Sequence, residues 1–403
     1  MRQEWEPEDL IEVWTVLEEG QERMRRLRAV ADQIQKIVTG LPGLKDVTGV
    51  WALADDRVAC GDAAFAADLG IALAGTYGSG EQMWQYRSVF EHLLRLLATT
   101  VGPENVAQAL RMVSSAEVAT RKLDRYTASL LASSHEAKDL AMAFTGRASE
   151  ELRACLVHEL VLRDVVVEET PGIAGWATSP HWGHHPLGWL PLALAEMERS
   201  ADLPSYSIRG SSHSMPYGPS ESRELAVIAD GDVPSAEETT TRATAAAMGK
   251  AVANWAEESN GRIEARMFDL AEPLEAQSVP NALLKLGLEC LRGVGNGTAL
   301  SIAAHPPAQA WQVLFAAAST GGAYNSGSHG AYGRLAAWQS LAALAGSPDG
   351  ATADEVEARV RGCAWHGFDA DTKWFEQVAW DIGLAALAPG RRRLAVLAAT
   401  DTD

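Results

Sequence analysis

Residues 171–219 read PGIAGWATSPHWGHHPLGWLPLALAEMERSADLPSYSIRGSSHSMPYGP and separate two regions of different pattern. Before this stretch the sequence is mostly amphipathic helix, and after it short apolar runs of strand type alternate with helices. Proline and glycine recur throughout it, so most of the stretch can be neither regular helix nor central strand. Because long irregular segments rich in Trp and His are usually functional, we expect this one to line a site.

Composition and charge exclude several classes of protein. The chain has 403 residues, 47% apolar and 22% charged, which is typical of a soluble globular protein with two domains or one large two-part domain. A net charge of −19 argues against nucleic acid or an anionic membrane as partner. The four cysteines form no C-x-x-C pair, the acidic start has no signal-peptide core, and no apolar run is long enough to cross a membrane. We therefore expect a cytoplasmic protein.

The first helix is expected over residues 8–38. Leu10, Val13, Leu17, Met24, Leu27, Ile34 and Val38 follow one another in steps close to a heptad, and the opposite face is charged. We favour a helix that packs this stripe on its own domain. The alternative is a homodimer in which residues 8–38 pair with a second copy.

The pattern of elements predicts an α+β fold that is predominantly α-helical. About seven further helices between residues 41 and 164 resemble an irregular bundle or α-solenoid. The later half predicts strands at 224–229, 263–270 and 393–399, a helix at 236–258, and a small mixed sheet of three or four strands packed by helices. Runs 355–363 and 375–387 fit either helix or strand. The domains expected are an N-terminal helix (1–40), an all-α domain (41–170), a connecting segment (171–220) and a smaller α/β domain (221–403).

The segment 319–334, STGGAYNSGSHGAYGR, is the strongest candidate for a ligand site. Its glycines allow a backbone to approach a ligand closely, and the helix that follows begins with free N–H groups and a positive dipole end. This chemistry suits a phosphate or another anion, although the segment matches no nucleotide-binding motif and has no lysine. The alternative is a flexible connector between two helices. Its candidate residues are His329 and Tyr324 for catalysis, and Asn325, Ser326 and Arg334 for ligand binding, with the Arg334 guanidinium as anion partner.

The histidines of the central stretch give a second set of candidates. His185 is a candidate catalytic residue, and His181 and Trp182 are candidate ligand contacts. With His184 they could supply imidazoles to a metal, but no H-E-x-x-H signature is present, and Pro180, Gly183 and Pro186 interrupt helical spacing. The alternative, which we favour in a Trp-rich loop, is that these histidines hydrogen-bond the backbone or stack on aromatic rings. Aspartates after the strands could hold Mg²⁺ but are more often turn formers and caps. We therefore predict no metal site, and no cofactor is indicated.

Four segments carry a family resemblance. Residues 84–98 (WQYRSVFEHLLRLLA), 185–195 (HPLGWLPLALA), 319–344 and 374–403 resemble an uncharacterised bacterial family, a domain of unknown function, which would cover most of the chain after about residue 37. That resemblance implies no activity, cofactor or site residue.

Two functions follow from these patterns. The first is an enzyme or small-ligand binder, for a ligand that is anionic or phosphorylated, whose pocket lies between the helical and α/β halves and is lined by the central stretch and the glycine-rich segment. The residues leave open whether the ligand is a substrate. The second is a non-enzymatic interaction or scaffold protein that uses the acidic helical half to hold a protein partner.

Overall fold

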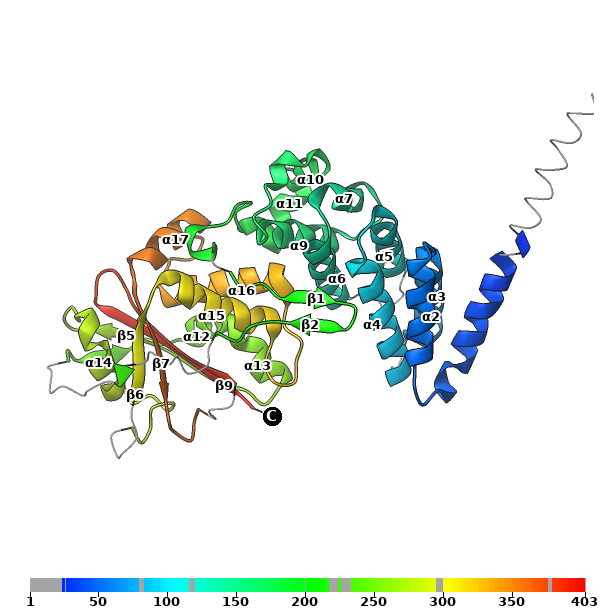
Figure 1. Ribbon diagram of the computed structural model, residues 1–403. Coiled ribbons are helices and arrows are strands. Elements are labelled where there is room, and N and C mark those ends of the chain that lie inside the picture. The colour runs from blue at the N-terminus through cyan, green and yellow to red at the C-terminus, as the bar shows by residue number, and fades with distance from the viewer. Residues whose placement is uncertain are drawn as a thin grey trace, which may run out of the picture. The chain divides into compact units, whose positions relative to one another are not determined.

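The computed structural model describes residues 24–25, 27–79, 83–115, 120–199, 201–216, 224–225, 233–294, 300–375 and 379–402 (Figure 1). The described chain forms two compact units, Met1–Thr120 with Ser207–Gly210, and Arg121–Tyr206 with Ser211–Asp403. Predictions for residues 8–23 and for 226–229 lie outside the described residues. No helix of the described chain is both long and apolar enough to span a bilayer.

The first unit consists of helices. After a helix over residues 27–40 come η1 (Leu41–Gly43), α2 (Thr48–Ala59), α3 (Ala63–Tyr77), α4 (Trp84–Thr99) and α5 (Pro103–Ser115). Asp62 caps α3 by accepting the backbone N–H of Phe65. Gly70 of α3 lets this helix lie close to α5, because a Cβ at Gly70 would be 2.6 Å from the Met112 side chain. Close helix packing of this kind agrees with the expected bundle.

The second unit begins with helices and short irregular pieces. The helices before the central stretch are α6 (Arg121–Ser134), α7 (Ala137–Leu140), α8 (Met142–Thr145) and α9 (Glu150–Val161). The central stretch itself contains only short elements, as its prolines and glycines predict: α10 (Pro171–Ala177), α11 (Pro180–His184), η3 (Pro186–Trp189), η4 (Glu196–Glu198), β1 (Ser205–Ser207) and β2 (Gly210–Ser212); η2 (Val167–Glu169) precedes them.

A seven-stranded sheet dominates the rest of the second unit. Its order is β3-β6-β7-β8-β9-β5-β4, and every neighbouring pair is antiparallel. The strands are β3 (Glu224–Leu225), β4 (Ala236–Glu238), β5 (Arg262–Leu270), β6 (Leu300–His305), β7 (Ala364–Ala370), β8 (Trp380–Leu387) and β9 (Arg393–Asp401). The helices among them are α12 (Arg242–Met248), η5 (Lys250–Val252), α13 (Ala253–Glu258), η6 (Ala276–Ser278), α14 (Val279–Lys285), α15 (Pro307–Thr320), α16 (His329–Leu344) and α17 (Ala353–Gly362).

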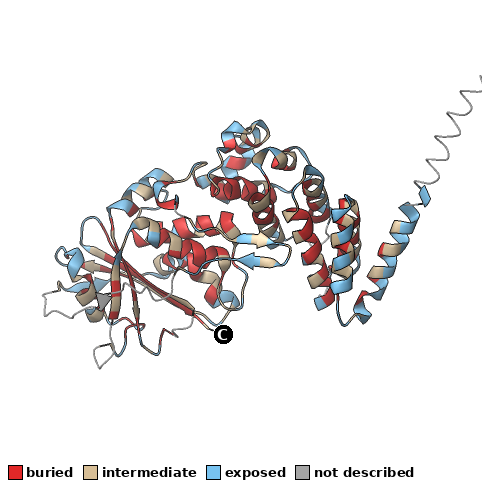
Figure 2. Ribbon diagram, in the orientation of Figure 1, coloured by how far each residue is buried: buried red, intermediate tan, exposed pale blue. Residues whose placement is uncertain are grey.

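Both faces of this sheet are covered, so its central strands are apolar throughout. Alternate residues of β9, such as Leu394, Val396 and Ala398, belong to one core with α14 and Trp374. The residues between them face the other side, where α13 and α16 contact β9. Eight of the nine residues of β9 are consequently buried (Figure 2). Covering on both faces explains why 393–399 shows an unbroken apolar run instead of alternation.

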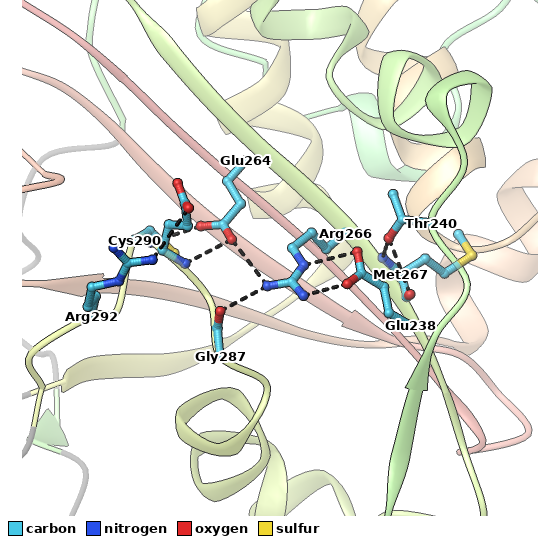
Figure 3. A network of polar contacts seen from close by, with 9 residues as sticks. Glu238, Thr240, Glu264, Arg266, Met267, Gly287, Cys290 and Arg292 are labelled. Carbon is cyan, nitrogen blue, oxygen red and sulfur yellow. Dashed lines mark hydrogen bonds and ion pairs between the residues drawn. The ribbon is translucent and has the colours of Figure 1, made fainter.

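One edge of the sheet is held by a polar network around Arg266 of β5 (Figure 3). Its guanidinium donates two hydrogen bonds to Glu238 of β4 and one to the Gly287 carbonyl. The neighbouring carboxylate, Glu264, accepts the backbone N–H groups of Glu289 and Cys290 at 2.9 and 2.8 Å. These bonds join β4, β5 and the segment after α14.

The structure confirms a predominantly α-helical α+β fold. It also has more strands than the sequence predicts, because β6 and β7 are short and lie directly next to helices. The helix expected over 236–258 is wrong in its first part, where β4 pairs with β5. The ambiguous runs resolve into α17 and β8. The compact units divide at Thr120, which places 121–170 with the sheet, whereas the expected all-α domain ended at 170.

Candidate functional site

Helix α16 is the central element of the second unit, and its first turns form the end of the glycine-rich segment 319–334. It contacts α6, α9, α12, α15 and α17 as well as β9. Most of its circumference is buried, including Gly330, Arg334 and Trp338, while Gln339 on the remaining face is exposed. A helix with this many neighbours positions side chains for several sites at once.

The glycine-rich segment before α16 folds back on its own unit. Gly327 N–H and Ser328 N–H donate to the Thr320 and Ala318 carbonyls. A Cβ at Gly327 would lie 2.3 Å from the Ser319 carbonyl oxygen, so only glycine fits there. The amides therefore close a tight connection between α15 and α16.

Two further amides of the segment also have protein acceptors. Ala323 N–H donates to Asp401 at the end of β9 at 2.7 Å, and Gly322 N–H donates to the Asn325 side chain at 3.2 Å. Asn325 in turn exchanges hydrogen bonds with Asn254 of α13. The candidate ligand contact Asn325 thus holds the loop in place.

A carboxylate of the protein occupies the anion position at the start of α16. Glu159 of α9, 2% exposed, accepts the Ala331 N–H at 3.2 Å and the Ser129 hydroxyl, and pairs with Arg163 at 2.8 Å. A Cβ at Gly330 would lie 2.6 Å from the same carboxylate. The helix terminus has the anion-binding chemistry that the sequence predicts, but its anion is internal.

Arg334 is likewise satisfied within the protein. Its side chain is fully buried, and its donors reach both Glu198 oxygens at 2.7 Å, His158 Nδ1 at 2.8 Å, and the Pro191 and Ala193 carbonyls at 3.0 Å. All five N–H groups of the guanidinium are therefore used. The expectation that Arg334 holds an external anion does not fit this geometry, because no donor is left for one.

The His158 ring completes this buried network in its neutral form. Its Nε2 lies 2.8 Å from the Leu187 carbonyl, which can only accept, so Nε2 carries the proton and Nδ1 accepts from Arg334. Burial, reinforced by the Arg334 charge, holds the pKa of His158 well below its usual value.

His185 belongs to a second polar cluster, built on Glu151. Its Nδ1 accepts the Leu187 N–H, so Nε2–H donates to Glu151 at 3.3 Å. The Tyr332 hydroxyl donates to the same oxygen, and Arg125 pairs with the other. Burial alone would raise the pKa of Glu151, but these hydrogen bonds and the Arg125 charge lower it. Both nitrogens of His185 are engaged, which leaves no free base on this ring.

Two other histidines lie beside His185 on a groove of about 430 Å³. His181 pairs with Glu150 at 3.4 Å and is 68% exposed, and His184 Nδ1 donates to the Pro180 carbonyl at 2.8 Å. The structure therefore brings together the histidines that the sequence singles out. In the described part of the chain no group of three or more His, Cys, Asp or Glu side chains is arranged to hold a metal ion.

The other candidate residues are scattered. Trp182 is buried between Trp176 and the rings of His158 and His185. Tyr324 is 60% exposed, and Ser326 is also exposed. Neither side chain belongs to the Glu159 or Glu151 cluster as described above.

His329 has the most unusual environment of the candidates. It takes a left-handed backbone conformation (φ 61°) and stacks on Tyr126 at 5.1 Å. Burial lowers the pKa of His329 to about 4, although the Glu159 charge opposes the shift. Its ring is therefore neutral at pH 7, but His329 and His185 contact different partners and form no single catalytic group.

A cavity of about 610 Å³ lies on the opposite part of α16, within the second unit. Trp189 and Pro186 of the central stretch form one wall, α12 and η5 another, and α16, the 347–351 turn and Val356 complete it. The volume is in the range of small-molecule sites, and the wall is mainly apolar. The glycine-rich segment does not line it, in contrast to the sequence expectation.

Four polar side chains line this cavity without a hydrogen bond or ion pair to another described residue: Lys250, Gln339, Ser347 and Asp349. Of these, the Ser347 hydroxyl is buried. None of the four could be singled out from the sequence, because nothing in a helical pattern shows which polar residues of α16 and η5 share a cavity. The one available signal was the S-P-D-G turn, which follows directly on α16.

Comparison with known proteins identifies a family but no activity. The model of a family of unknown function, DUF6183, matches residues 48–403. No curated protein and no solved structure matches the chain. The match begins after the N-terminal helix and includes α16, the groove and the cavity. The chain therefore belongs to the family of unknown function DUF6183.

Proposed function

We propose that this protein binds a small amphipathic molecule in the 610 Å³ cavity beside α16. The observation that carries the proposal is the cavity itself, whose mainly apolar wall also carries three exposed polar side chains, Lys250, Gln339 and Asp349, that have no described protein partner. A ligand with an apolar body and a polar end would bury the apolar wall and keep its polar end beside these side chains.

The residues that line the cavity favour a binding site over a catalytic site. Catalytic sites usually gather groups with shifted pKa values. The described groups with the largest shifts, such as His158, Cys155 and His329, do not line the cavity. The titratable groups that do line it are Lys250 and Asp349. We therefore propose a binding protein in preference to an enzyme.

The test is a cavity-filling substitution with a matched control on the same helix. Ala246 of α12 lines the cavity, and Ala243, one turn earlier, does not; both are exposed. With 8-anilinonaphthalene-1-sulfonate as fluorescent probe, we expect saturable binding that Ala246→Trp weakens at least tenfold and Ala243→Trp changes less than twofold. Equal binding by both variants would remove the proposal.

The described end of the first helix supports a second candidate, self-association. Met24 and Leu27 are 53% and 55% exposed, whereas Ile34 and Val38 of the same seven-residue pattern are buried. Exposed apolar residues that continue a heptad stripe are typical of pairing helices. In sequence, residues 4–22 carry eight acidic side chains and residues 23–28 four arginines, so a second copy in antiparallel orientation would place opposite charges together. We propose a homodimer through residues 8–38.

The alternative to a second copy is a scaffold role, in which the acidic helical half holds a protein partner. The net charge of −19 supports this alternative.

The cysteines support a cytoplasmic location as a proposal. The described cysteines are all free, three buried and Cys60 exposed, which fits action in a reducing compartment such as the cytoplasm.

A further inference from the structure

We infer that the ligand of this cavity is a zwitterionic amphiphile, with an ammonium and an anionic group joined to an apolar body. The inference rests on the proposed function and names the chemistry of that site. It is carried by Lys250 and Asp349, which line the same cavity from two different segments, η5 and the turn after α16.

The two charges are available to a ligand. Neither Lys250 nor Asp349 forms an ion pair with a described residue, and they do not pair with each other within 4.0 Å. This contrasts with the surroundings of α16, where Arg334, Arg163 and Arg125 are all paired with carboxylates. Two exposed charges of opposite sign, neither with a partner among the described residues, complement a molecule that carries both signs.

A ligand with a single charge fits this lining less well. A monoanion would pair with Lys250 and leave Asp349 without a ligand partner, and a monocation would do the reverse. A zwitterion satisfies both residues at once.

The other residues that line the cavity determine the apolar part of the ligand. Leu335, Val356 and the Trp189 ring offer apolar contact. The exposed Gln339 amide offers hydrogen bonds to the ligand. Trp189 is fixed for this contact, because its Nε1–H donates to the Ala351 carbonyl at 3.2 Å and its ring packs edge-on against Trp338.

The experiment compares three probes with the same decyl chain by isothermal titration of the full chain, below their micelle concentrations. They are N-decyl-N,N-dimethylglycine (zwitterion), decanoate (anion) and decyltrimethylammonium (cation). We expect the zwitterion to bind at least fivefold more tightly than either singly charged probe. Lys250→Met should weaken the zwitterion and decanoate at least threefold, and Asp349→Asn should weaken the zwitterion while strengthening decanoate. Asp354→Asn, an exposed carboxylate on α17 that does not line the cavity, is the control and should change none of the three.

Two failures can be told apart. If the probes bind and Ala246→Trp abolishes binding, but affinity depends neither on probe charge nor on Lys250 and Asp349, the zwitterion inference is wrong and the binding site stands. If no probe binds, or Ala246→Trp has no effect on the probes that do, the cavity is not a ligand site and both proposals fall.

Discussion

The Glu159 carboxylate accepts the backbone N–H of Ala331 at 3.2 Å, so one helix of the protein caps the start of another. These two residues are far apart in the chain, on α9 and α16. The relationship explains how α16 can begin deep inside the unit, because an anion at a helix N-terminus is favourable and the buried charge is also paired with Arg163.

Neutralising this carboxylate should destabilise the protein. For Glu159→Gln we expect a loss of about 1–3 kcal/mol in the free energy of unfolding, the usual cost of losing hydrogen bonds to a buried charged group. Urea unfolding followed by tryptophan fluorescence measures it. Glu150→Gln, on the same helix but exposed, should change the free energy by less than about 0.5 kcal/mol. Equal effects for the two variants would contradict the capping role.

A methyl group at Gly330 should have a comparable effect by a steric route. The Cβ of Gly330→Ala would lie 2.6 Å from the Glu159 carboxylate and would displace it, at an expected cost of about 1–3 kcal/mol. Gly183→Ala, in the short helix α11, has no atom within 4 Å of the added Cβ and should be neutral. Thermal melting of both variants decides the point, and an unchanged midpoint for Gly330→Ala would show that the helix start is loosely packed.

The Arg334–Glu198 pair should behave as a coupled unit. Arg334→Met leaves the Glu198 carboxylate buried without its main partner, so we expect a loss of about 3–5 kcal/mol. Adding Glu198→Gln removes the unpaired charge and should recover part of that loss. A double-mutant cycle measures the coupling. Additive effects of the two substitutions would mean that the pair contributes no energy beyond its separate contacts.

Stability should fall below neutral pH, partly because of His329. Its pKa is lowered to about 4 in the folded protein against an ordinary value near 6.5, so between these values the unfolded chain binds the extra proton. The free energy of unfolding therefore decreases as pH falls from about 6.5 to about 4, by at most about 1.4 kcal/mol per pH unit for this group. His329→Gln should therefore flatten the slope in that window. Chemical denaturation at several pH values tests the difference.

The oligomeric state should depend on the exposed end of the first helix. If residues 8–38 pair two copies, Met24→Glu with Leu27→Glu places charges in the interface and should convert a dimer to a monomer. Light scattering coupled to size exclusion gives the mass directly. Substitution of exposed Val101, an apolar residue away from this stripe, with Glu is the control. A monomer for the unsubstituted protein would end the proposal.

The sequence predicts which residues form helices and strands better than it predicts which of these elements pack or pair together. The helices before the central stretch follow from periodicity, and the strand β9 follows from its unbroken apolar run. The central stretch is irregular because its prolines interrupt hydrogen bonding. The strand β4 was missed because a three-residue strand has no period of its own, and only pairing with β5 defines it.

Less of the candidate site than of the fold could be predicted from the sequence. The segment 319–334 has the residues of an anion cradle, but sequence spacing does not reveal that Glu159, from another helix, already fills the helix terminus. The acceptors of Arg334 could not be predicted from the sequence either, because they lie on segments that come together only in the folded chain. The histidines of the central stretch were found, because they are close in sequence as well as in space.

The cavity beside α16 is assembled from segments that extend from Pro186 to Val356, so no part of the unit can form it alone. A molecule that occupies it therefore recognises only the completely folded unit and leaves the unfolded chain unbound. By mass action such a ligand would add about 2.7 kcal/mol to the free energy of unfolding at a concentration one hundred times its dissociation constant. The amount of intact protein in a cell would then rise and fall with the supply of this molecule, through protection from degradation.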